Sequence, residues 1–121
     1  MKKVLFVLMF LFSAFVINAQ TVKKDVGNHV FIMCDAQTEP VTIKGQAFYI
    51  VLHDNGIVQM LCGSTLKDAI SYGPTKSGSW SVTGNTVSWE WTDGKSAAWR
   101  YSSSSHNLIS GESILKNMGA F

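Results

Sequence analysis

The sequence predicts an all-β protein, in which an antiparallel meander forms a small barrel or half-barrel that includes at most one short helix. Three observations support this prediction. Short apolar runs rich in strand formers alternate with turns built from Gly, Asn and Asp along the chain. Two consecutive hairpins in the tryptophan-rich segment, residues 79–101, place their apolar residues on one shared face. About one hundred residues follow the N-terminal apolar run, which is enough for one domain with a modest core.

Residues 1–19 are predicted to be a signal peptide, and residues 20–121 a single β domain. Two lysines precede an apolar run over residues 4–17, and Ala19 offers a small residue for cleavage. A helix of this run would be about 21 Å long, which is shorter than a bilayer-spanning helix of about 20 residues. We therefore expect a secreted or periplasmic protein, and an uncleaved membrane anchor is the alternative.

The charge balance excludes one class of partner. The chain has 10 basic and 8 acidic residues, and two of the basic residues, Lys2 and Lys3, lie in the predicted signal peptide. The remaining domain is neutral and has no run of basic residues, so nucleic acid is not an expected partner.

The two cysteines, Cys34 and Cys62, are predicted to form a disulfide, because an exported chain reaches an oxidising compartment. Closing this loop would stabilise the fold by about 3 kcal/mol. Two free thiols are the alternative. The spacing is not typical of a zinc site, since there is no CxxC pair and no paired histidine.

The first half of the domain begins with a polar lead-in over residues 20–28. The segments predicted as strands are then 29–35, 41–44, 46–53 and 57–63. Segment 46–53 is apolar on both faces, which is typical of a strand covered on both sides. The turn at 54–56 is predicted to have three residues, because that length pairs apolar with apolar positions, and Gly56 then takes the left-handed position.

The second half begins with the least β-like stretch, residues 64–77, in which residues 65–70 are expected to form a helical turn or two. After the two tryptophan hairpins, residues 102–105 are expected to be a serine loop and residues 107–110 a short strand. Residues 112–118 fit a helical turn or a final strand equally well.

The two tryptophan hairpins have a defined register. A two-residue Gly84-Asn85 loop sets Trp80 opposite Trp89. A three-residue loop at 92–94 then sets Trp89 opposite Ala97 and Trp91 opposite Lys95. The tryptophans therefore share one apolar face.

This face carries the candidate ligand-binding residues, which are Trp80, Trp89, Trp91, Trp99 and Lys95. Tryptophans on one face can stack on a sugar or line a pocket for an apolar ligand. The alternative is that they fill the core of a small barrel. Trp91, at a strand end opposite Lys95, is the tryptophan most expected to lie at a rim.

No catalytic or metal-binding motif is present, so no enzyme activity, cofactor or metal is predicted. The histidines His29, His53 and His106 are far apart in the sequence. They would form a site only if the fold gathered them.

The turn and tryptophan pattern resembles that of lipocalin-like β-meanders in small exported bacterial proteins of the Bacteroidetes type. The residues that carry the resemblance are Gly78, Trp80, Gly84, Asn85, Asp93 and Gly94, within residues 46–110. The resemblance implies an antiparallel meander that closes into a small barrel or half-barrel, and it implies no catalytic residue.

The expected function is that of an exported ligand-binding or interaction module without catalysis. Its partner would be a small apolar or carbohydrate ligand or an envelope protein. The alternative is a protein inhibitor of a secreted hydrolase, such as a lysozyme or protease, that presents loop 64–77 or loop 102–106. A small hydrolase or metal enzyme is a third hypothesis.

Overall fold

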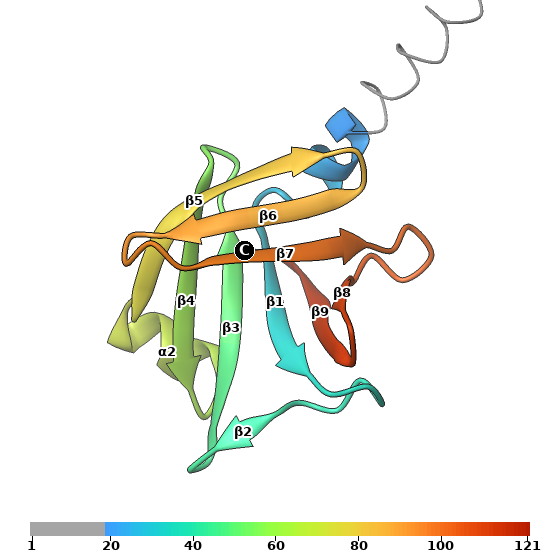
Figure 1. Ribbon diagram of the computed structural model, residues 1–121. Helices are drawn as coiled ribbons and strands as arrows, with labels where there is room; N and C mark the ends of the chain where they lie inside the picture. Colours follow the sequence, from blue (N-terminus) through green and yellow to red (C-terminus); the bar gives the residue numbers. More distant parts are fainter. Residues whose placement is uncertain (1–18) are drawn as a thin grey trace, which may run out of the picture.

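The computed structural model describes residues 19–121, and their strands form a closed antiparallel barrel (Figure 1). The strands of this part of the chain are β1 (His29–Cys34), β2 (Thr42–Ile43), β3 (Gln46–Leu52), β4 (Ile57–Gly63), β5 (Lys76–Thr83), β6 (Thr86–Trp91), β7 (Ser96–Tyr101), β8 (Leu108–Ser110) and β9 (Ser113–Ala120). Their hydrogen-bonded order runs β1-β9-β8-β7-β6-β5-β4-β3, and β3 pairs back with β1. The predicted all-β meander is confirmed, and the ring of strands is complete.

The three predicted hairpin turns have the predicted lengths and registers. Leu52 pairs with Val58 across the first turn, Trp80 with Trp89 across the second, and Trp89 with Ala97 across the third. The glycine in each turn has a positive φ, between 61° and 90°. Glycine suits these turns because a side chain would clash in the left-handed conformation. The turn residues therefore set the pairing of five strands, β3 with β4 and β5 to β7.

The C-terminal segment, for which a helical turn and a strand fitted equally well, is a strand. It forms β9, which pairs with β8 on one side and with β1 on the other. This strand joins the two ends of the meander and closes the barrel.

The expected polar lead-in at residues 20–28 is wrong, because residues 19–26 are helical and cover one end of the barrel (Figure 1). Val22 and Val26 are one helical turn apart and are buried in the barrel core with exposed fractions of 3% and 0%. In the sequence, two lysines and an aspartate separate these valines, so the segment reads as polar. The predicted signal peptide falls on residues 1–18, which lie outside the described residues, and on Ala19.

A second helix, α2 (Leu66–Tyr72), confirms the helical turn expected between β4 and β5 and extends it to Tyr72. Its N-cap is Thr65, whose hydroxyl oxygen accepts a hydrogen bond from the Asp68 backbone N–H at 3.2 Å. Ala69 is buried against β4, where Gly63 permits close contact: a Cβ on Gly63 would lie 2.6 Å from the Ala69 nitrogen. No helix within residues 19–121 has the length and hydropathy needed to cross a bilayer.

Two apolar clusters lie on opposite faces of the strands. The larger cluster fills the barrel interior and includes Phe31, Leu52 and the buried tryptophans. The smaller cluster lies on the outer face of β1, β3 and β4, where Leu66 and Ala69 of α2 cover it. Strand β3 contributes to both clusters, which explains why its sequence is apolar on both faces.

The predicted disulfide is wrong, because Cys34 and Cys62 are both free. Strands β1 and β4 each pair with β3, so they are two strand spacings apart, about 10 Å, whereas a disulfide needs Cα atoms within about 7 Å. The two side chains also point to opposite faces. Cys34 belongs to the outer cluster with Ala47, and Cys62 pairs with Phe48, the next residue along β3. Burial raises the pKa of the Cys34 thiol.

Candidate functional site

Three of the five predicted site residues lie in the barrel core. Trp80, Trp89 and Trp99 have exposed fractions of 6%, 4% and 8%, and all belong to the interior cluster. Trp91 is half-buried and packs against the same cluster, whereas Lys95 is exposed. The four indoles are thus one continuous group that extends from the core to Trp91 at the end of β6.

The register of β6 and β7 determines how the indoles contact one another. Trp89 pairs with Ala97 and Val87 pairs with Trp99, so Trp89 and Trp99 are diagonal neighbours on the inner face. Their rings are stacked, with centroids 6.1 Å apart and planes 17° apart. Trp91 meets Trp89 edge to face, also at 6.1 Å. Small Ala97 opposite Trp89 leaves room for this stack.

The three buried indoles differ in their hydrogen bonds. The Trp80 Nε1–H donates to the His53 carbonyl oxygen at 2.7 Å. The Nε1–H groups of Trp89 and Trp99 are buried and have no hydrogen-bond acceptor within residues 19–121. Leaving a buried donor unsatisfied costs about 1–3 kcal/mol, and few such groups occur in native proteins. This pair of donors is the most unusual chemical feature of the interior.

Trp91 lies at the end of the barrel opposite helix 19–26, among residues that are only partly covered. Met33 and Met60 are half-buried there and pack against the interior cluster. The Lys76 ammonium lies 5.9 Å from the centroid of the Trp91 ring and 3.5 Å from the Asp93 carboxylate. Hereafter, this group of Met33, Met60, Lys76, Trp91 and Lys95 is called the rim.

The sequence analysis identified neither Lys76 as a rim residue nor Asp93 as its ion-pair partner. Lys76 has the same parity along β5 as Trp80, and that parity is the signal that could have found it. Asp93 accepts a hydrogen bond from the Lys95 backbone N–H at 2.9 Å. This bond, aided by the charge of Lys76, lowers the pKa of the Asp93 carboxyl. The turn therefore holds a carboxylate beside Lys76 and fixes the end of β6.

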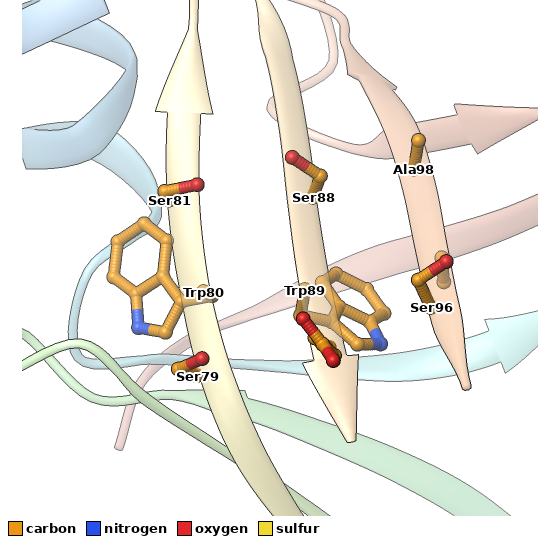
Figure 2. Close-up of a pocket in the computed structure, with 9 residues that line it drawn as sticks. Ser79, Trp80, Ser81, Ser88, Trp89, Ser96 and Ala98 are labelled. Carbon is orange, nitrogen blue, oxygen red and sulfur yellow. The ribbon is translucent and has the colours of Figure 1, made fainter. Parts of the chain in front are cut away.

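The outer face of the same three strands carries a hollow of about 470 Å³ (Figure 2). Along β5, β6 and β7, small residues alternate with the inward-facing indoles. The small and polar residues that line the hollow are Ser79, Ser81, Ser88, Ser96, Ala98 and Glu90. Most of these small side chains are exposed. Trp80, Trp89 and Ala97 also line the hollow, although they belong to or pack against the interior cluster.

The three histidines do not form one site. The His53 Nε2 atom lies 2.8 Å from the Gln59 side-chain oxygen, while His29 and His106 bond to other groups. Within residues 19–121, no group of three or more His, Cys, Asp or Glu side chains is placed to hold a metal ion.

No protein-family model, curated protein or solved structure matches the chain. The resemblance to lipocalin-like proteins therefore stays a prediction, and the site must be interpreted from its own geometry.

Proposed function

We propose that the protein is an exported, non-catalytic binding module whose barrel receives a small, largely apolar ligand with one hydrogen-bond acceptor. The observation that carries this proposal is the pair of buried, unpartnered indole N–H groups of Trp89 and Trp99. An oxygen of the ligand would accept from one or both of them. The contrast with Trp80, whose N–H has a backbone acceptor, indicates that this fold can satisfy a purely structural indole.

The rim supports a direction of entry. Helix 19–26 covers the other end of the barrel with Val22 and Val26, whereas the rim residues are only half-buried or exposed. Methionine side chains adapt to irregular ligands because they are unbranched and polarizable. The apolar part of the ligand would therefore contact Met33, Met60 and Trp91, with Lys95 beside it.

The test uses dodecanoate, which has an acceptor carboxylate, and dodecylammonium, which has the same chain and no acceptor. Binding below the micelle concentration is measured by calorimetry. We expect dodecanoate to bind more tightly, and Trp99→Phe or Trp89→Phe to weaken dodecanoate binding about tenfold, as expected for loss of a charge-assisted hydrogen bond.

Trp80→Phe is the matched control, because it shortens a buried indole whose N–H is already satisfied by the protein. It should leave the preference for dodecanoate unchanged. The proposal fails if neither probe binds, if both bind equally, or if all three tryptophan variants lose the same affinity. A loss caused by general disruption of the core would appear in Trp80→Phe as well.

A second proposal, inhibition of a secreted hydrolase, rests on exposed side chains between β4 and β5. Ile70 and Tyr72 of α2 are 47% and 72% exposed. Large exposed apolar side chains of this kind often mark protein contacts. Inhibition of a lysozyme or a serine protease that is lost in an Ile70→Ser, Tyr72→Ser variant would support it, and undiminished hydrolysis with excess protein would reject it.

A further inference from the structure

A cleft of about 520 Å³ lies at the end of the barrel opposite the rim. It is formed between helix 19–26, the start of β1, the loop after β7 and the end of β9. The side chains that line it include Lys24, Asp25, His29, Ser105, His106 and Asn117. These groups belong to neither proposed interface, so their arrangement calls for a separate explanation.

The hydrogen bonds of buried Tyr101 determine the chemistry of His106. The Tyr101 hydroxyl donates its one proton to the Asp25 carboxylate at 2.8 Å. Its oxygen also lies 2.8 Å from the His106 Nδ1 atom, so Nδ1 must carry the proton of that second bond. The neutral imidazole then has an unprotonated Nε2, which is a hydrogen-bond acceptor. Burial and the Asp25 carboxylate raise the pKa of Tyr101 to about 12, so its hydroxyl keeps this proton at neutral pH.

His29 is oriented in the same way by a different partner. Its Nδ1 lies 2.8 Å from the Gly27 carbonyl oxygen, which can only accept a hydrogen bond. Nδ1 is therefore protonated, and the Nε2 of the neutral ring is a second acceptor. Two histidines that line the same cleft are thus held as acceptors by bonds on their other nitrogen.

The two formal charges of the cleft have no ion-pair partner within residues 19–121. Lys24 and Asp25 are consecutive in a helix, where side chains diverge by about 100°, so they do not neutralise each other by direct contact. The cleft thus presents one formal cation, one formal anion and two imidazoles whose Nδ1 atoms are already engaged in hydrogen bonds. A ligand of zero net charge that carries both an ammonium and a carboxylate complements this set.

The backbone that carries His106 supports a functional interpretation. His106 has a φ of 61°, in the left-handed region that non-glycine residues seldom adopt. Its carbonyl oxygen accepts from the Asn117 side-chain amide at 3.2 Å, and its backbone N–H donates to the Ser102 carbonyl oxygen at 2.7 Å. Several bonds thus hold the loop in a conformation that presents His106 to the cleft.

We propose that this cleft is a binding site for a small zwitterion with a primary amine and a carboxylate, such as a free amino acid or an unblocked dipeptide. The amine donates to Asp25 and to the Nε2 atoms of His29 and His106. The carboxylate accepts from the Lys24 ammonium and the Ser105 hydroxyl. This site is independent of the binding proposed for the barrel interior, because it uses no residue of the rim.

Calorimetry with alanyl-alanine, its N-acetyl derivative and its C-terminal amide tests the proposal on the full protein. We expect the unblocked dipeptide to bind at least tenfold more tightly than either blocked form. Lys24→Met should abolish the preference for the free carboxylate over the amide, and His29→Ala should weaken the preference for the free amine.

Lys67→Met and His53→Ala are the matched controls, because these residues lie outside the cleft. They should leave all three affinities unchanged. Equal binding of the three probes, absence of binding at millimolar dipeptide, or an equal loss in Lys24→Met and Lys67→Met would each overturn the proposal. Thermal unfolding of every variant separates loss of the site from loss of the fold.

Discussion

Replacing single tryptophans by phenylalanine should separate the structural indole from the two unpartnered indoles in the ligand-free protein. Trp80 and Trp99 are almost equally buried, at 6% and 8% exposed, and both lie in the interior cluster. Both substitutions remove similar volume from the core, at a cost of about 1–2 kcal/mol. Only Trp80→Phe also removes a hydrogen bond, to the His53 oxygen, worth about 1 kcal/mol.

Trp99→Phe instead removes a donor whose burial without a partner costs about 1–3 kcal/mol. In Trp99→Phe, removal of this unpartnered donor should therefore largely offset the free energy lost through poorer packing. We expect Trp80→Phe to lower the free energy of unfolding by about 2–3 kcal/mol and Trp99→Phe to change it by less than about 1 kcal/mol. For a domain of about 100 residues, a difference of 2 kcal/mol corresponds to roughly 8–16 °C in Tm.

Urea unfolding followed by circular dichroism, with thermal scans in parallel, provides the measurement. Trp89→Phe should behave like Trp99→Phe, because its N–H is also unpartnered. Equal destabilisation by all three substitutions would refute the reasoning, since it would mean that the Trp89 and Trp99 N–H groups are satisfied in the ligand-free protein. If the reasoning holds, saturating dodecanoate should raise the free energy of unfolding of the wild-type protein more than that of Trp89→Phe or Trp99→Phe.

Three further predictions concern other parts of the fold. A thiol assay should find two reactive thiols in denaturant without reductant. In the native protein Cys34 should react more slowly than Cys62, because Cys34 is buried and the pKa of its thiol is raised. An absence of reactive thiols would show that the two cysteines form a disulfide. The pKa of Tyr101 is about 12 in the folded state and about 10 in the unfolded state, so its contribution to stability is full below pH 10 and is lost as the pH rises towards 12. Tyr101→Phe should flatten the dependence of the free energy of unfolding on pH between 10 and 12. An unchanged dependence would contradict the raised pKa of Tyr101. Gly63→Ala should destabilise the protein by about 1–3 kcal/mol, because its Cβ would lie 2.6 Å from the Ala69 nitrogen of α2, and an undiminished urea midpoint would show that α2 can shift freely.

Local chemistry predicted three of the nine strand pairings within residues 19–121. Gly56, Gly84 and Gly94 fix the turns, and parity then fixes which residues face inward, so the pairs of β3 with β4 and of β5 to β7 follow from neighbouring sequence. The closure of the ring could not be predicted in this way. β1 and β9 are separated by most of the domain, and no turn connects them.

The errors have a common physical cause, which is that they depend on packing between distant segments. The helical face of Val22 and Val26 has only two apolar residues, and it becomes significant only because the end of the barrel lies beside it. The disulfide was predicted from the oxidising compartment alone. The strands that carry Cys34 and Cys62 are kept apart by β3, which lies between them in the sheet.

The candidate site was predicted in part. The five residues were found from alternation and strand ends, but alternation cannot separate a core wall from a pocket wall. The hydrogen bond from Trp80 and its absence at Trp89 and Trp99 are properties of the assembled barrel. Likewise, the hydrogen bond beneath the cleft joins Asp25 and Tyr101, residues 76 positions apart that no local pattern links.

The double pairing of β1 has a consequence for how the chain folds. β1 bonds to β3, which follows soon after it, and to β9, which is the last strand of the described chain. Until β9 is available, β1 and β8 each present an open edge that can pair with other chains. A protein shortened by β9 should therefore aggregate rather than fold, because both of these edges would stay open.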